Sequence, residues 1–307
     1  MNVIVTGATS FLAVPVIVRL LEQGHRVIAA VRPHSLHLGK LPQGYPNLTV
    51  LPLALEQFSR IEAMVTEPCD VCVHFGWDGA GSENRTKRSI QQKNVTDSMQ
   101  VLEGVARLGC KRFLFSGSQA EYGICREPMS ENTPCHPVSE YGKAKVDFCS
   151  LAIPKCKKLG MDYIHTRIFS VYGPGDHPYS LVPSCIRTFM KEGTMLLGEC
   201  TQLWNYLYID DLAQGLLALL SHPEPLSAHG VLYNLAGLAE ETRPLREYIE
   251  TIHRLCKGRG SYQYAQRPAN AEGPANLIPD ITKVTRITGW RPTTSFEEGI
   301  KKMIEGA

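Results

Sequence analysis

The stretch Asn2-Val3-Ile4-Val5-Thr6-Gly7-Ala8-Thr9-Ser10-Phe11-Leu12-Ala13 decides the fold of this chain. An apolar β-branched run passes through a glycine-containing turn into residues 11–23, where apolar side chains recur three and four positions apart. The pattern predicts a strand that feeds directly into a helix. Backbone N–H groups and the helix dipole at such a junction can hold a pyrophosphate, so we expect a dinucleotide here, the alternative being a plain strand–helix turn.

The turn keeps a T-G-x-x-G-x-x-G spacing with two replacements. Ala13 stands at the third glycine position, where it suits close packing of helix on strand. Ser10 stands at the second position, where its Cβ lies in the path of the phosphates.

Outward from this turn, short apolar runs alternate with segments of helical periodicity. Uniformly apolar strands are typical of parallel sheets that are covered on both faces. Because helices separate these strands, right-handed crossovers and an open, doubly wound α/β sheet are predicted. The strands are expected at 2–6, 25–31, 48–52, 70–75, 112–116 and 162–168, and the helices at 11–23, 89–108 and 139–159.

Beyond Gly173-Pro174-Gly175 the pattern loosens. Helices are predicted at 181–191, 211–220, 245–256 and 295–304, a strand at 231–235, and an extended connection over 258–280. We therefore expect a Rossmann domain over 1–173 with return segments near 205–240. A smaller carboxy-terminal lobe is expected over 174–204 and 241–307.

Composition excludes several classes of protein. The 307 residues are 43% hydrophobic and 20% charged, which is ordinary globular usage, and a net charge of +2 is too small to predict binding to nucleic acid or an anionic membrane. The chain has no apolar run of bilayer length and no signal-like start, so a cytoplasmic protein with reduced thiols is expected. Cys69-Asp70-Val71-Cys72 is an isolated C-x-x-C pair, and no metal site is predicted.

The end of the second predicted strand bears on cofactor choice. An NAD-binding site usually offers a carboxylate there, whereas this chain reads Val31-Arg32-Pro33-His34-Ser35. Arg32, His34 and Ser35 can make charge-assisted bonds to a 2′-phosphate, which favours NADP(H), with NAD(H) possible. The alternative is a solvated surface arginine.

Tyr141 and Lys145, four positions apart, share one face of a predicted helix. A lysine ammonium beside the phenol favours its ionised form and brings a proton donor towards working pH. Ser118, at the end of a strand, can donate a hydrogen bond to the same substrate oxygen. These three residues are the predicted catalytic group.

In this context the chain resembles the extended short-chain dehydrogenases/reductases, specifically the NAD(P)-dependent nucleotide-sugar epimerases, dehydratases and ketoreductases. The resemblance spans nearly the whole chain and implies that the lobe over 174–204 and 241–307 binds the substrate. Beyond the Gly7 turn and the catalytic group, it rests on Tyr122-Gly123, Pro128-x-Ser130-Glu131, Arg167 to Gly175, Tyr206 to Ala213, Tyr233-Asn234-Leu235 and Thr288-Gly289-Trp290-Arg291-Pro292. It implies cofactor binding by Gly7, Thr9, Ser10, Phe11, Leu12, Arg32, His34, Ser35, Phe75, Gly76, Tyr141, Lys145 and Ile168.

Departures from the family pattern narrow the chemistry. The 4,6-dehydratases carry an Asp-Glu pair where this chain has Gln119 and Ala120, so dehydration is rejected unless Glu121 serves instead. An Asn and an Arg that often bind the substrate phosphates are replaced by Ser170 and Trp204, and Arg267 remains as a cation for the diphosphate. Trp204 is alternatively part of the lobe core. The substrate-binding residues implied are Gln119, Ala120, Glu121, Ser170, Trp204 and Arg267.

Three functions follow from this interpretation. The first is an NADPH-dependent ketoreductase acting on a deoxysugar nucleotide, in which Lys145 also binds the nicotinamide ribose. The second is a 4-epimerase with tightly bound NAD, and the third is a non-catalytic NADP-binding sensor. The resemblance also implies a homodimer through the helices at 89–108 and 139–159.

Overall fold

The computed structural model describes residues 1–81, 83–267 and 275–306. They form two compact units, each built from several segments of the chain. The first comprises Met1–Glu121, Pro137–Arg167 and Ala213–Tyr233, and the second Tyr122–His136, Ile168–Leu212 and Asn234–Ala307. The repeated exchange of segments is the arrangement expected of a doubly wound core that shares its chain with a smaller lobe.

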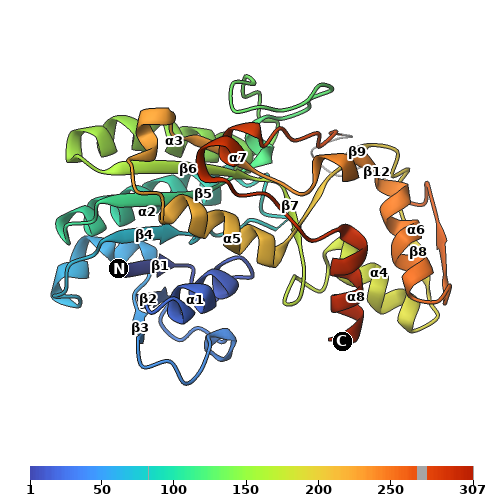
Figure 1. The fold of residues 1–307 in the computed structure, drawn as a ribbon, viewed down its shortest axis with the longest axis horizontal. Coiled ribbons are helices and arrows are strands. Elements are labelled where there is room, and N and C mark those ends of the chain that lie inside the picture. Colours follow the sequence, from blue (N-terminus) through green and yellow to red (C-terminus); the bar gives the residue numbers. More distant parts are fainter. Residues whose placement is uncertain (82, 268–274, 307) are drawn as a thin grey trace. The chain divides into compact units, whose positions relative to one another are not determined.

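A seven-stranded sheet dominates the first unit, and Figure 1 shows its strands side by side from β6 to β3. The strand order is β11-β6-β5-β4-β1-β2-β3, with β1 pairing in parallel with both β2 and β4. This order confirms the predicted doubly wound sheet. Its strands are β1 (Asn2–Thr6), β2 (Arg26–Val31), β3 (Leu48–Pro52), β4 (Val71–His74), β5 (Arg112–Ser118), β6 (Asp162–Ile168) and β11 (Leu232–Leu235).

Helices cover the sheet, so most of its strands are buried on both faces, whereas the edge strand β3 leaves Thr49, Val50 and Pro52 exposed. Alternate strand residues, including Ile4, Cys72 and Phe113, pack in one cluster with Val101 of α2 and Phe148 of α3. Each large apolar side chain in this cluster stabilises the fold by roughly 1.5–3 kcal/mol. The helical elements around the sheet are α1 (Ala13–Glu22), η1 (Leu38–Lys40), η2 (Leu55–Ala63), α2 (Arg88–Arg107), η3 (Gln119–Glu121), α3 (Glu140–Leu159), α5 (Ile209–Leu220) and η4 (Leu226–His229).

The second unit is assembled from short strands and helices. Three two-stranded pairs, β10 with β7, β12 with β9 and β13 with β8, take the place of a continuous sheet. The elements are β7 (Ser170–Tyr172), α4 (Leu181–Met190), β8 (Thr194–Leu196), β9 (Leu203–Trp204), β10 (Tyr206–Tyr208), η5 (Ala239–Glu241), β12 (Arg243–Pro244), α6 (Leu245–Leu255), β13 (Ser261–Gln263), α7 (Thr282–Thr288) and α8 (Phe296–Glu305).

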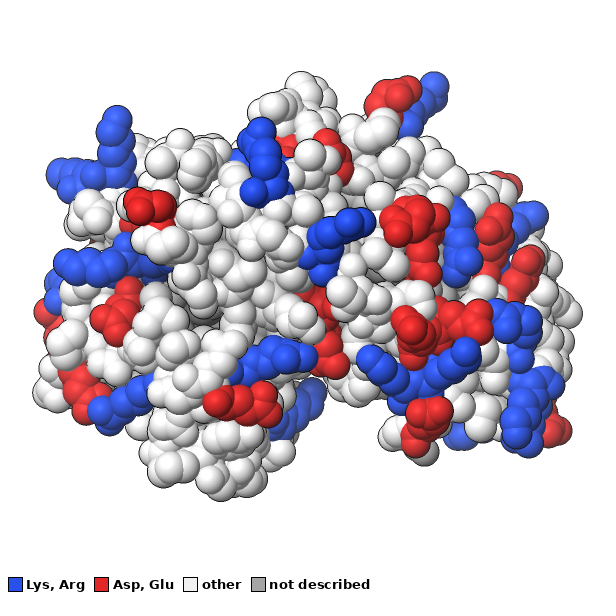
Figure 2. Space-filling model, in the orientation of Figure 1, with Lys and Arg blue, Asp and Glu red and all other residues white. Residues whose placement is uncertain are grey.

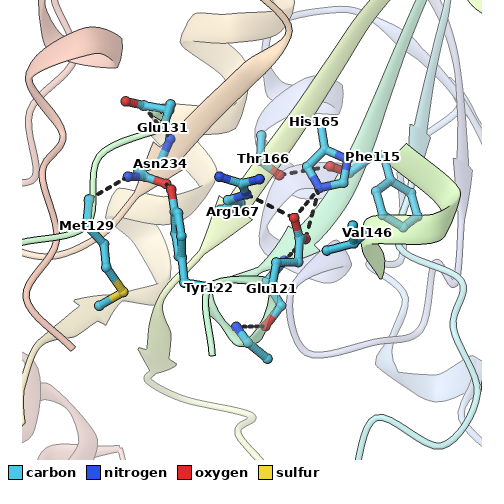
Figure 3. A network of polar contacts seen from close by, with 12 residues as sticks. Phe115, Glu121, Tyr122, Met129, Glu131, Val146, His165, Thr166, Arg167 and Asn234 are labelled. Atoms are coloured by element: carbon cyan, nitrogen blue, oxygen red, sulfur yellow. Dashed lines mark hydrogen bonds and ion pairs between the residues drawn. The ribbon is translucent and has the colours of Figure 1, made fainter. Parts of the chain in front are cut away.

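Several motifs outside the predicted catalytic group hold this second unit together. The Tyr122 hydroxyl donates to Asn234 Oδ1 at 2.6 Å, and the Asn234 N–H donates to Glu131 Oε1 at 2.8 Å (Figure 3). The Trp290 indole donates to the Asp211 carbonyl at 3.1 Å. These hydrogen bonds satisfy buried polar groups, so the motifs around positions 122, 131, 211, 234 and 290 have a structural role.

Some elements differ from expectation. β5 extends two residues beyond 116 to Ser118, and α7 lies in a segment for which no helix was predicted. Within the expected connection 258–280, β13 pairs with β8, while residues 268–274 lie outside the described part. None of the described helices has the length and apolarity needed to cross a membrane.

Candidate active site

Ser118 is the last residue of β5, and its side chain is only 8% exposed. Its hydroxyl accepts a hydrogen bond from the Ala120 N–H at 3.2 Å. Gln119 and Ala120 follow directly in η3, so the carboxyl end of β5 passes into a tight turn. In open α/β sheets, ligands bind at the carboxyl ends of the strands, which places Ser118 at the expected edge.

Helix α3 positions Tyr141 and Lys145 one turn apart. The Ser139 hydroxyl caps this helix by accepting from the Gly142 N–H at 3.1 Å. Tyr141 is 8% exposed, and its backbone N–H donates to the Arg85 carbonyl at 2.9 Å. Lys145 Nζ lies 5.5 Å from the centre of the Tyr141 ring, so the ammonium and phenol share one face of the helix as predicted from their spacing.

The Lys145 side chain is 2% exposed and is held from several sides. Nζ donates to the Ser116 carbonyl at 2.7 Å, and it lies 3.8 Å from the centre of the Trp77 ring and 4.4 Å from that of Phe115. Burial lowers the pKa of Lys145 to about 7, opposed by Glu121 and assisted by the Arg85 cation. Lys145 therefore changes charge in the physiological pH range.

Two of these neighbours were not predicted from the sequence. Trp77 follows β4, and its indole donates to Gln91 Oε1 of α2 at 2.8 Å, which fixes the ring. Arg85 places its guanidinium 4.1 Å from the centre of the Tyr141 ring. The one available signal was that both residues lie in the loop after β4, at the same carboxyl edge of the sheet as Ser118.

Glu121 lies behind Ser118 and is completely buried. One oxygen, Oε1, accepts the Ser118 N–H at 2.8 Å, and His165 Nε2 lies 2.9 Å from the same oxygen. Arg167 Nε donates to Oε2 at 2.9 Å, and Figure 3 shows His165 and Arg167 converging on the carboxylate from β6. Burial raises the pKa of the Glu121 carboxyl. The opposing effects of His165, Arg167 and the Ser118 N–H are larger, so the pKa is lowered and the carboxylate is ionised.

The turn after β1 has the conformation that a pyrophosphate site requires. Gly7 has a φ of +60°, and a Cβ at this position would lie 2.7 Å from the Gly76 nitrogen. The backbones at Gly7 and Gly76 therefore approach each other too closely for a side chain at position 7. Thr6, beneath the turn, is linked to His74 Nδ1 at 2.5 Å.

Ser10 is accommodated by a local hydrogen bond. Its Oγ accepts from the Ala13 N–H at 3.3 Å, where α1 begins. Within the described residues, α1 has no side-chain cap at Leu12 and no acidic residue in its first turn. The Ala13 and Val14 N–H groups donate to Ser10, and Pro15 has no N–H, so this helix start offers an anion mainly its positive dipole, which fits a dinucleotide phosphate.

The other predicted cofactor residues are distributed around the same sheet edge. Arg32 and His34 are exposed just after β2, and Ser35 is half-buried with its Oγ accepting from the His37 N–H at 3.3 Å. Thr9, Phe11 and Leu12 are half-buried in the turn. Phe75 is 7% exposed after β4, and Ile168, at the end of β6, is 6% exposed.

The remaining predicted substrate residues belong to the second unit. Ser170 is half-buried in β7, Trp204 is half-buried in β9, and Arg267 is exposed just before the undescribed residues. Trp204 packs against a small core that includes Phe169 and Leu277, in agreement with the core alternative. Its cross-strand partner is Arg243, which the sequence analysis did not identify.

Charge and cysteine placement add two observations. On the face drawn in Figure 2, acidic and basic side chains are interspersed, in line with the small net charge. Cys69 and Cys72 are buried thiols at β4, and Cys69 Sγ donates to the Val71 carbonyl at 3.2 Å. The described residues contain no cluster of three His, Cys, Asp or Glu side chains suited to a metal ion.

A doubly wound sheet with a glycine turn after β1, and a Ser, Tyr and Lys at its carboxyl edge, defines a nicotinamide-dependent oxidoreductase of the short-chain type. The chain belongs to the NAD dependent epimerase/dehydratase family, whose model matches residues 3–236. This membership confirms the resemblance recognised in the sequence and the assignment of the chain as an enzyme.

Individual relatives are distant. A Bacillus subtilis protein named as an uncharacterized UDP-glucose epimerase, YtcB, is 25% identical over 99% of this chain and 97% of its own length. The dTDP-6-deoxy-L-talose 4-dehydrogenase (NAD(+)) of Aggregatibacter actinomycetemcomitans is 33% identical over 47% of this chain and 52% of its own. The crystal structure of a Thermotoga maritima UDP-glucose 4-epimerase superimposes with a TM-score of 0.88 at 22% identity, covering 99% and 98% of the two chains.

Proposed function

We propose that this enzyme oxidises and reduces a ring carbon of a nucleotide sugar by proton transfer at Tyr141. The carrying observation is the buried Lys145 ammonium on the same helix face as the Tyr141 phenol. The cation favours the phenolate, so Tyr141 can take a proton from a sugar hydroxyl or return it to a carbonyl oxygen. The Ser118 hydroxyl donates a hydrogen bond to that oxygen. A nicotinamide, when bound at this edge of the sheet, would supply the hydride chemistry.

Two reactions use this group, and we propose 4-epimerisation with NAD as the first. Relatives aligned over nearly the whole chain are named as UDP-glucose epimerases. Keto reduction with NADPH is the second candidate, favoured by the exposed Arg32 and the missing carboxylate after β2. The Glu121 carboxylate is completely buried and is held by Ser118, His165 and Arg167. It is therefore not a candidate to contact substrate or to serve as the acid or base of a 4,6-dehydration.

The second unit supplies the proposed nucleotide-binding residues. Trp204 and Arg243 are opposite each other in the antiparallel β9–β12 pair, so their side chains share one face. The Arg243 guanidinium lies 4.5 Å from the centre of the Tyr248 ring. We propose that Arg243 supplies a cation for the diphosphate in place of an arginine at position 204, together with Arg267 and with Ser170.

Denaturing the purified protein and identifying the released nucleotide separates the two reactions. Stoichiometric NAD indicates an epimerase, whereas an empty site that exchanges NADP(H) indicates a reductase. Turnover is then measured with UDP-glucose or UDP-galactose for the first and, by NADPH oxidation, with 4-keto-6-deoxy sugar nucleotides for the second. Absence of turnover in both assays would overturn the proposed function and leave the sensor. Light scattering tests the proposed homodimer against the 34.0 kDa monomer.

A further inference from the structure

Glu121 occupies a costly position for which the fold alone gives no reason. Its carboxylate is fully buried and is balanced by two side chains from one strand, His165 and Arg167. Breaking a buried ion pair is strongly destabilising, yet replacing the whole pair by apolar groups is often neutral or stabilising. The three polar groups are therefore not needed simply to fill this part of the core.

The geometry around Glu121 is also tightly constrained. A Cβ at Gly117 would lie 2.4 Å from His165 Nε2 and 2.5 Å from Glu121 Oε1. Only glycine at this position lets the carboxylate and the imidazole meet directly behind the strand. The same carboxylate oxygen accepts the Ser118 N–H, so the network fixes the backbone from which the Ser118 hydroxyl extends.

The Glu121 carboxylate and the Lys145 side chain bind the same end of β5, since Glu121 accepts the Ser118 N–H at 2.8 Å and Lys145 Nζ donates to the Ser116 carbonyl at 2.7 Å. The charge of Glu121 therefore acts on Lys145. Burial lowers the pKa of Lys145, the Glu121 carboxylate raises it, and the Arg85 cation lowers it. His74 on β4 also lies near Lys145, but burial and Lys145 lower the pKa of His74 to about 3, so the imidazole adds no charge. Tyr141 on α3 is the group on which Lys145 acts. Within the described residues, Glu121 is the acid whose charge offsets the burial of Lys145.

We propose that Glu121, held by His165 and Arg167, is a positioning residue that acts on the catalytic group in two ways. Its carboxylate fixes Ser118 through the backbone N–H, and its negative charge favours the protonated form of the Lys145 side chain beside Tyr141. The inference rests on the proposed function, in which Ser118, Tyr141 and Lys145 carry the reaction. The two contributions of Glu121 differ in what they require. The contact with Ser118 depends on the length of the side chain, and the effect on Lys145 depends on its negative charge.

Two substitutions separate these contributions. Glu121→Gln retains the shape of the side chain and removes its charge, so Lys145 loses its proton at lower pH. On the alkaline limb of the kcat/KM profile, activity then falls tenfold for each pH unit by which the limb moves. Glu121→Asp keeps the charge but shortens the side chain, so kcat falls while the alkaline limb stays near that of the wild type.

Asp162→Asn is the matched control. Like Glu121, Asp162 is a carboxylate in a buried ion pair, and one of its oxygens lies 2.8 Å from Arg112 Nε. Asp162 is the first residue of β6, whereas Arg167, which holds Glu121, lies near the end of that strand. The substitution is expected to reduce stability and to leave the pH profile in place. If E121Q shifts the profile no more than D162N does, the role of Glu121 is merely structural and the proposal is wrong.

Trp77 provides a readout that does not depend on turnover. Its ring lies against the Lys145 ammonium, so its fluorescence changes when Lys145 loses its proton. The midpoint of this change is expected at lower pH in E121Q than in the wild type and E121D, and to be absent from W77F. Coincident midpoints in the wild type, E121Q and E121D would overturn the proposal even if no sugar nucleotide is turned over. Failure of turnover alone would count only against the proposed function. If E121Q does not fold, a midpoint in E121D that falls below that of the wild type contradicts the charge role.

Discussion

Replacing Lys145 by methionine is expected to stabilise the fold while abolishing turnover. Methionine has a similar unbranched shape and carries no charge. In the folded protein, burial lowers the pKa of Lys145 from 10.5 to about 7. At neutral pH the unfolded chain therefore binds a proton at Lys145 that the folded chain holds only half of the time, which favours unfolding.

The sign and size of the effect follow from that difference. Between pH 7 and 10.5 the unfolded state binds more protons, so the free energy of unfolding of the wild type rises with pH. Each pH unit contributes about 1.4 kcal/mol once the folded-state lysine is neutral, and the rise between pH 7 and pH 9 is about 2 kcal/mol. K145M lacks this contribution, so its stability advantage over the wild type shrinks by that amount over the same interval.

Urea unfolding at pH 7, 8 and 9 measures the difference. Comparing the change with pH, rather than stability at one pH, removes the packing and hydrogen-bond effects of the substitution itself. Lys143→Met, an exposed lysine on the same helix, controls for the loss of one positive charge. If the wild-type and K145M stabilities run parallel from pH 7 to pH 9, Lys145 is not a destabilising buried cation and the argument fails.

Three further outcomes are expected. Tyr141→Phe lowers kcat/KM by about 10²–10⁴-fold and retains cofactor affinity, because only the proton-transfer group is lost. Steady-state kinetics and calorimetric cofactor binding test this expectation, and near-normal turnover would contradict it. Arg32→Ala weakens NADP⁺ binding and leaves NAD⁺ binding unchanged in fluorescence titrations, whereas equal effects on the two cofactors would mark Arg32 as a solvated residue. Arg112→Met leaves Asp162 buried without its cation and lowers the free energy of unfolding by about 3–5 kcal/mol in urea denaturation, a loss under about 1 kcal/mol being incompatible with a buried pair.

Local periodicity was enough to predict the sheet. β1, β3 and β6 begin and end at the predicted residues because each is a short run rich in β-branched and aromatic side chains. The spacing of Tyr141 and Lys145 likewise predicts their shared helix face, since a helix brings positions four apart together.

The surroundings of the catalytic group could not be predicted in the same way. Trp77 and Arg85 reach Tyr141 and Lys145 from a loop more than fifty positions earlier in the chain, and a loop has no period from which side-chain direction follows. The second unit was difficult for a related reason. Its strands are two or three residues long, too short to show an alternation, and β8 pairs with β13 across more than sixty positions.

Glu121 illustrates how a correct motif can carry a different role from the one its position suggests. From the sequence, a carboxylate three residues after Ser118 is a candidate to contact substrate. The cations that hold it, His165 and Arg167, come from β6, where the sequence predicts only a buried strand. The ionisable residues His165 and Arg167 inside this buried strand were the available sign that a buried charge needed partners, because charges are buried in protein cores only when paired. Burial of Lys145 lowers its pKa towards the range in which proton transfer operates, and a second buried charge limits how far that pKa falls. The carboxylate and the lysine therefore have to be buried together, which is why the chain tolerates a polar network in a core that could be more stable without it.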